Sequence, residues 1–318
     1  MTGSVSEEEE IARYLRSGDY DPYFSAWPGD FCESATRAGA ELKSALTAEL
    51  RKRTEGASPP ALPPDADLVA LTRRKIGPMI GGLFPARERE RVLSALERSV
   101  VFLTPATIVE TLTNAQWLGT AWNLANLYLG SVKAELLSPD APRLVGLSEG
   151  TTCYVSAEYF EDRHRFADLI VHETAHVLHN CKRRTIGLPE TRSREWLLEL
   201  DFRKRETFAY ACEAYSRILE LASSRGERVR LLEELAAGSL PDDERVDAAE
   251  YLDILRDALT SRNGWKRILA RCGAERPRSA ALSGALPRRP EPRGDLPRRA
   301  GPEAHPPVRQ KHVSSSGS

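Results

Sequence analysis

The strongest constraint on the fold of this chain is the run at residues 166–181, Phe-Ala-Asp-Leu-Ile-Val-His-Glu-Thr-Ala-His-Val-Leu-His-Asn-Cys. Apolar residues recur on one side of this run at helical spacing, and its histidines fall on the other side, which predicts an amphipathic helix. His172, Glu173 and His176 stand in the order H-E-x-x-H. On a helix, His172 and His176 lie one turn apart on the same face. The run therefore predicts a helix that presents two imidazoles side by side.

Two imidazoles placed in this way can bind one Zn²⁺ ion. Glu173 would stand beside the metal as the general base for a metal-bound water. His179 lies seven residues beyond His172, about 10.5 Å along the helix axis, so we expect it to line the cleft or support a ligand. No histidine follows His179 until His305, which argues against a site with three histidine ligands.

The third ligand is therefore expected to be a carboxylate from a later helix. We favour Glu206 and leave Glu195 and Glu213 as alternatives. Glu206 and Glu213 share one stripe of a predicted helix at 204–222, but they lie two turns apart, so only one of them can bind the same ion. A partly buried carboxylate at this place needs a cation. As an alternative to metal binding, Glu206 could pair with the basic run at 203–205.

These residues resemble the gluzincin group of zinc metallopeptidases over residues 117–222. The resemblance implies a zincin-like core with a cleft-bordering strand at 151–156, the active-site helix and the glutamate helix at 204–222. It implies a zinc-dependent peptidase acting on a peptide or protein, with the strand aligning the substrate. Tyr210 would either donate to the oxyanion or simply pack. The Asn-Glu form of the second motif, common in that group, is absent here.

The rest of the chain indicates an α+β fold that is mostly helical. A β-hairpin is expected from the short runs at 143–147 and 151–156. Gly77-Pro78 and Gly81-Gly82 are expected to break the chain between two helices. Further helices are predicted at 7–16, 33–53, 68–76, 86–101, 117–137, 194–202, 227–237 and 243–259.

The expected domain organisation has three parts. Residues 1–67 form an N-terminal helical segment that ends in a Pro-rich linker. Residues 68–272 form the zincin-like metallopeptidase domain. Residues 273–318 are rich in Pro and Arg and lack a burial pattern, so we expect a disordered tail.

Composition excludes some classes of function. The formal net charge of −1 gives no field that would attract nucleic acid. Five scattered cysteines without a C-x-x-C pair suit a reducing compartment. The N-terminus lacks the pattern of a secretory signal, and no apolar run is long enough to span a membrane, so we expect a cytoplasmic protein.

Three alternatives to a peptidase remain open from the sequence. The chain could be a zinc-binding regulatory protein without catalytic activity, a metal-free helical protein, or a zinc hydrolase of non-peptide amides. The substrate and the oligomeric state are also left open.

Overall fold

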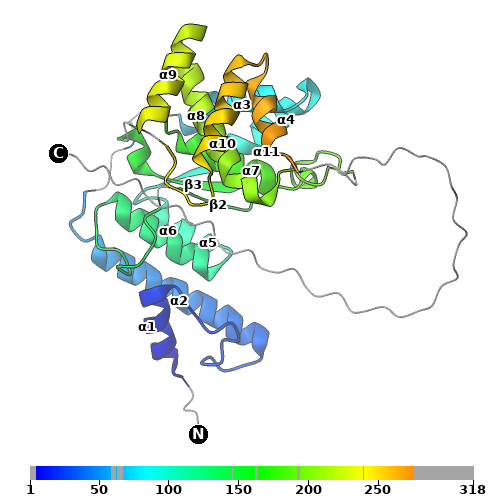
Figure 1. The fold of residues 1–318 in the computed structure, drawn as a ribbon. Coiled ribbons are helices and arrows are strands. Elements are labelled where there is room, and N and C mark those ends of the chain that lie inside the picture. Colours follow the sequence, from blue (N-terminus) through cyan, green and yellow to red (C-terminus); the bar gives the residue numbers. More distant parts are fainter. Residues whose placement is uncertain are drawn as a thin grey trace, which may run out of the picture.

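A computed structural model describes residues 5–58, 62, 67–144, 146–161, 164–191, 194–238 and 240–274. The predicted Pro-rich linker covers residues 54–67, of which 59–61 and 63–66 lie outside the described residues, as does the predicted tail at 273–318 from residue 275 onwards. Within the described part the fold is α+β and mostly helical (Figure 1). Its α-helices are α1 (Glu7–Ser17), α2 (Phe31–Arg53), α3 (Leu68–Leu83), α4 (Ala86–Leu96), α5 (Ile108–Asn114), α6 (Leu118–Ser131), α7 (Leu169–Asn180), α8 (Arg205–Leu221), α9 (Arg225–Gly238), α10 (Ala248–Thr260) and α11 (Gly264–Cys272).

A small three-stranded sheet has the order β1-β3-β2. β2 (Gly146–Glu149) and β3 (Thr152–Ser156) form the predicted antiparallel hairpin, with β2 starting a few residues later than expected. β1 (Val100–Leu103) pairs in parallel with the other side of β3. The prediction that the strand at 151–156 adds a substrate strand is therefore wrong, because β3 is already paired on both sides. The edge strand of this hairpin is β2.

The sheet separates α7 from α6 (Figure 1). α7 packs on β2 and β3 from one side, and α6 contacts the same two strands from the other. Two hydrophobic clusters follow from this arrangement. One gathers apolar residues of α3, α7, α8, α10 and α11, and the other those of α1, α2, α5 and α6. The second cluster contains residues from both sides of the domain boundary predicted at residue 67.

Three helix predictions were wrong. α3 continues through Gly77-Pro78 and Gly81-Gly82, and Gly82 packs directly against the Trp265 side chain of α11. The helix predicted at 86–101 ends at Leu96, because the apolar residues that follow form β1. The segment at 194–202 forms no α-helix, and only its last residue, Phe202, begins a short 3-10 helix (Phe202–Lys204). Trp196 instead pairs with Lys182 in an isolated bridge, which ties this segment to the end of α7.

Two helix ends also differ from the expectation. The helix predicted to reach residue 137 stops at Ser131, where Lys133 takes a left-handed φ of 56° and donates its N–H to the carbonyl of Gly130. Towards the other end of the chain, α10 begins at Ala248 instead of residue 243, and α11 (Gly264–Cys272) was not predicted.

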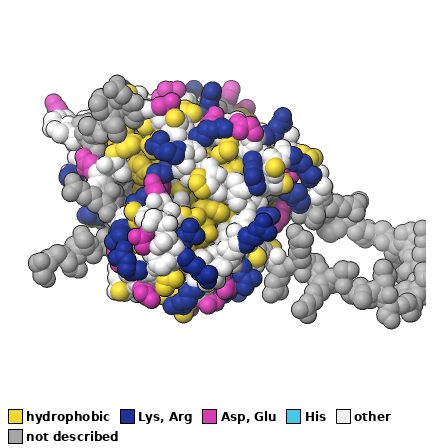
Figure 2. Space-filling model, turned by 90° about the horizontal axis from the view of Figure 1, so that it is seen from above, with side chains coloured by type: hydrophobic (Ala, Val, Ile, Leu, Met, Phe, Trp, Pro, Cys, Tyr) yellow, Lys and Arg dark blue, Asp and Glu magenta, His cyan; other side chains and the backbone are white. Residues whose placement is uncertain are grey.

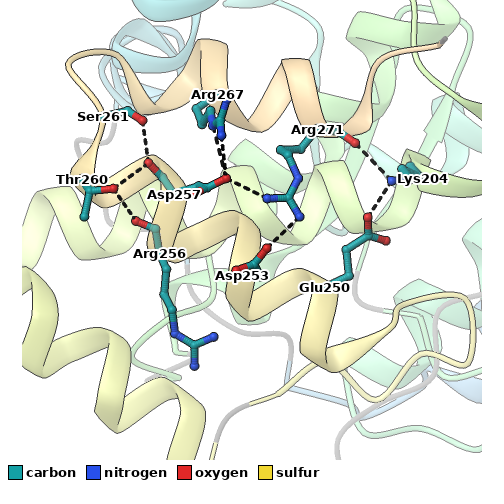
Figure 3. A network of polar contacts seen from close by, with 9 residues as sticks. All are labelled: Lys204, Glu250, Asp253, Arg256, Asp257, Thr260, Ser261, Arg267 and Arg271. Atoms are coloured by element: carbon teal, nitrogen blue, oxygen red, sulfur yellow. Dashed lines mark hydrogen bonds and ion pairs between the residues drawn. The ribbon is translucent and has the colours of Figure 1, made fainter.

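Charged side chains join α10 and α11 to the start of α8 (Figure 3). Asp257 of α10 accepts from Arg267 and Arg271 of α11, at 3.0 and 2.7 Å. Lys204, directly before α8, donates to Glu250 at 2.6 Å and to the Arg271 carbonyl at 3.2 Å. These bonds fix the first turn of α8, which carries Glu206.

The face seen from above carries Lys and Arg interspersed with Asp and Glu, with apolar side chains gathered between them (Figure 2). This mixture of signs agrees with the net charge of −1. Among the residues that the structure describes, no helix combines the length and the apolar character needed to cross a bilayer.

Candidate metal centre

α7 is a buried helix whose first turn is held in place by capping. Asp168 is the N-cap residue, and its side chain accepts from the N–H of Val171. Every residue from Ile170 to His179 is buried, because α3, α8 and the sheet pack around the helix. An amphipathic surface helix would turn its histidines towards solvent. In α7 the histidines are buried instead. They face α8, which packs along α7.

This packing brings together the three ligands predicted from the sequence. His172, His176 and Glu206 form a buried group that could hold a metal ion. The Nε2 atoms of the two histidines are 3.1 Å apart. Oε2 of Glu206 lies 3.4 Å from Nε2 of His176 and 4.0 Å from Nε2 of His172.

These spacings fit a metal ion better than hydrogen bonding. Ligand atoms at about 2.0–2.1 Å around a tetrahedral ion stand about 3.3 Å from one another. Oε2 of Glu206 is buried, and no hydrogen bond reaches it from the part of the chain that the structure describes. A buried carboxylate oxygen without a donor is costly unless a cation compensates it. Two imidazoles and one carboxylate also form a donor set found in catalytic zinc sites.

The other oxygen of Glu206 has a different partner. Arg245, from the segment between α9 and α10, lies 3.0 Å from Oε1. Burial raises the pKa of Glu206, but His176, His172 and Arg245 outweigh it and lower the pKa to about 2. The carboxylate is thus ionised at any ordinary pH. Of the alternative partners at 203–205, Lys204 pairs with Glu250 and the Arg205 guanidinium lies over the Phe202 ring.

Glu213, an alternative third ligand, supports His172 instead. Its Oε2 lies 3.1 Å from Nδ1 of His172, and its Oε1 accepts from the N–H of Asp168 at 2.7 Å. A carboxylate only accepts, so one proton sits on Nδ1, and when the ring is neutral its Nε2 lone pair is turned towards the group. Burial lowers the pKa of His172, but Glu213 raises it to about 9 in the metal-free protein.

Glu195, the remaining alternative, lies outside the group. It is exposed and forms an ion pair with Lys182 at 2.7 Å. The segment that carries it is held against the end of α7 by backbone bonds, including that from the N–H of Arg183 to the Glu195 carbonyl.

Glu173, the expected general base, lies against the edge strand. A Cβ added to Gly146 of β2 would stand 2.7 Å from Oε1 of Glu173, so only glycine leaves room for this carboxylate. Burial raises the pKa of Glu173, while the nearby His176 and His172 and a hydrogen bond from Ser148 act in the opposite direction. A raised pKa makes the carboxylate a stronger base.

His179 and Tyr210 border the group. Nε2 of His179 lies 3.0 Å from Nδ1 of His176. Burial, together with His176 and Arg205, lowers the pKa of His179 to about 3, so the ring is neutral. The ring of Tyr210 meets that of His172 edge-on, with centroids 4.5 Å apart.

Three contributors were missed by the sequence analysis: Asp168, Gly146 and Arg245. Asp168 could have been found, because it stands where an N-cap residue is expected before the first apolar turn. Gly146 and Arg245 give no local signal. Their roles depend on β2 packing on α7 and on the α9–α10 connection reaching α8.

Comparisons of the chain with models of known protein families, with curated proteins and with solved structures found no match. The functional argument therefore depends on the geometry of this group of residues.

Proposed function

We propose that this protein is a zinc-dependent peptidase with a zincin-like core, in which His172, His176 and Glu206 hold the metal. The observation that best supports this proposal is the convergence of three buried ligand atoms, one of them a carboxylate oxygen without a hydrogen bond. Zn²⁺ at these ligands would supply Lewis-acid chemistry, polarising a carbonyl and making water reactive near neutral pH.

The chain's own residues would do the rest. Glu173, beside the ligands and with a raised pKa, would take the proton from the attacking water. β2 pairs with β3 on one side only among the described strands, so its other side can add an extended peptide by main-chain hydrogen bonds. Tyr210, whose ring lies against that of His172, would donate its hydroxyl proton to the developing oxyanion.

One observation favours the alternative of a zinc-binding protein without catalysis. His172, Glu173, His176 and Glu206 are only 1%, 2%, 1% and 4% exposed, so a peptide reaches them only after the site opens. We favour the peptidase because structural zinc sites normally complete four protein ligands. Here the group that could hold an ion contains three, which leaves a position for substrate or water.

The test is zinc content per chain, followed by peptide hydrolysis, on the purified full chain. Wild type is expected to bind one zinc, and His176→Ala and Glu206→Ala to lose it. Glu195→Ala is the matched control and should keep the metal, because Glu195 pairs with Lys182 at the surface.

Glu173→Gln separates the two functions. It should keep its zinc and lose hydrolysis of a mixed fluorogenic peptide library by about 10²–10⁴-fold, the usual contribution of a general base. Stoichiometric zinc with no hydrolysis in wild type would establish the non-catalytic alternative, and no zinc in wild type would reject both.

A further inference from the structure

His179 binds no metal in the arrangement described above, yet it is buried in direct contact with a metal ligand. Its Nε2 lies 3.0 Å from Nδ1 of His176, and its own Nδ1 lies 3.0 Å from Oδ1 of Asn180. The three side chains form a line along one side of α7, leading from the ligand group towards the helix end. His179 itself is 3% exposed, whereas Asn180 is exposed.

The side chain of Asn180, at the end of this line, determines which ring nitrogens of His179 and His176 carry protons. The carboxamide oxygen of Asn180 only accepts, so Nδ1 of His179 carries a proton. In the neutral ring of His179, Nε2 then has the lone pair. Nδ1 of His176 must donate to it, which leaves Nε2 of His176 with the lone pair that faces the ligand group. A carboxylate or a backbone carbonyl usually does this for a metal-binding histidine.

We infer that His179 is the positioning residue for His176, fixing its Nδ1–H tautomer and ring orientation so that Nε2 is presented to the metal. This inference rests on the metal centre proposed above. It also explains the sequence H-E-T-A-H-V-L-H physically, since residues three apart on a helix are neighbours. His176 and His179 have this spacing, and their rings meet edge-on with centroids 5.2 Å apart.

The two ligand histidines are then held by different chemistry. Glu213, an anion from α8, orients His172, whereas His179, a neutral ring from α7 itself, orients His176. The support of His176 is therefore contained within one helix. Neither hydrogen bond in this line comes from α8.

The first experiment measures the dissociation constant of Zn²⁺ by competition with a chromophoric chelator, using the full chain at fixed pH. His179→Phe keeps an aromatic ring and removes the acceptor, and His179→Gln keeps an acceptor. We expect His179→Phe to weaken zinc binding by about 10–100-fold, as loss of such a partner usually does. His179→Gln should stay within about threefold of wild type, because its carboxamide oxygen can take the same proton.

His164→Phe is the matched control, because it removes an exposed histidine that precedes α7 and should leave zinc affinity unchanged. Far-UV circular dichroism of the metal-free variants checks that all of them fold. Equal affinity of wild type and His179→Phe would overturn the inference. It would also be overturned if His179→Gln and His179→Phe lost affinity equally, since the acceptor would then be irrelevant.

A second measurement does not require metal binding. Long-range ¹⁵N–¹H spectra of the metal-free chain should show His176 as the Nδ1–H tautomer in wild type and in His179→Gln, and a changed tautomer population in His179→Phe. An Nε2–H tautomer for His176 in wild type would overturn the inference directly. If zinc fails to bind to wild type while the spectra agree, the proposed function fails and the assignment of His179 to His176 stands.

Discussion

At the scale of single residues, the centre depends on a glycine as much as on its ligands. Gly146 lies where β2 passes Glu173, and a methyl group there would overlap the carboxylate. In the proposed peptidase, a displacement of the base by about 1 Å can cost up to about 100-fold in rate. We therefore expect Gly146→Ala to lower turnover by at least about tenfold while zinc content stays at the wild-type value.

Gly119→Ala is the control for that experiment. Gly119 lies in α6, and nothing stands within 4 Å of an added Cβ, so turnover should be unchanged. Peptide hydrolysis and zinc content, measured together on both variants, test whether the effect is specific to the position of Glu173. A Gly146→Ala variant with full turnover would show that Glu173 is not held against β2 during catalysis.

The raised pKa of His172 predicts how metal binding depends on pH. Burial lowers this pKa, Glu213 raises it, and the result in the metal-free protein is about 9. Below pH 9 the metal must displace a proton from His172, so its apparent affinity should rise about tenfold per pH unit from pH 6 to 8. Glu206, with a pKa of about 2, adds nothing to this slope. Chelator competition at pH 6, 7 and 8 measures the slope, and a flat profile would contradict the proton assignment of His172.

At the scale of the elements, α3 shows where a glycine is required and where it is not. A Cβ at Gly82 would stand 2.2 Å from Cδ1 of Trp265, whereas nothing lies within 4 Å of one at Gly81. Gly82→Ala should destabilise the fold by about 1–3 kcal/mol, the usual cost of overpacking. Gly81→Ala should stabilise it by about 0.5–1 kcal/mol, because alanine loses less conformational entropy in a helix.

Urea unfolding of the two single variants measures this difference. The expected shifts have opposite signs in adjacent residues of the same helix. Two shifts of the same sign would show that α3 and α11 do not pack as described.

The same helix shows why the sequence prediction partly failed. Gly77-Pro78 and Gly81-Gly82 indicate a break locally, but packing of Gly82 on Trp265 supports a continuous helix. β1 was hidden for a similar reason, because its partner β3 lies about fifty residues further along the chain. Local periodicity cannot report a pairing at that separation. α7 and α8 were predictable because each carries its own helical pattern of buried residues.

The residues of the candidate centre fall into the same two classes: those predictable from local spacing and those that depend on tertiary packing. His172 and His176 follow from spacing within one helix, and Glu206 was favoured from its stripe on the next. Glu213 could not be assigned a role from the sequence. Two turns separate it from Glu206, and only the packing of α8 on α7 shows that Oε2 of Glu213 reaches Nδ1 while Oε2 of Glu206 faces the Nε2 atoms.

At the scale of the whole molecule, two hydrophobic clusters lie on either side of the sheet, and only one of them surrounds the metal centre. Leu46 of α2 is completely buried in the other cluster. Leu46→Ala should destabilise the protein by about 2–5 kcal/mol, as expected for a buried leucine. Zinc content should remain one per chain, because α2 packs mainly on α1, α5 and α6, which carry none of the residues of the centre.

Thermal unfolding and zinc analysis test this expectation together. Leu240→Ala is the control, since Leu240 is 37% exposed and should have little effect on stability. Loss of zinc from folded Leu46→Ala would show that the two clusters are coupled more tightly than their contacts indicate. The predicted domain boundaries, the cytoplasmic location and the absence of nucleic-acid partners stay predictions.

The near-complete burial of the ligand group has a consequence for how the ion would enter and leave. Side chains that are 1–4% exposed give a chelator no direct access, so an ion could escape only when α7 and α8 separate locally. The rate of metal release would then equal the rate of that opening and would not increase with chelator concentration. Such a protein would acquire its ion most readily while the chain is still folding, and its metal content would record the conditions of its synthesis.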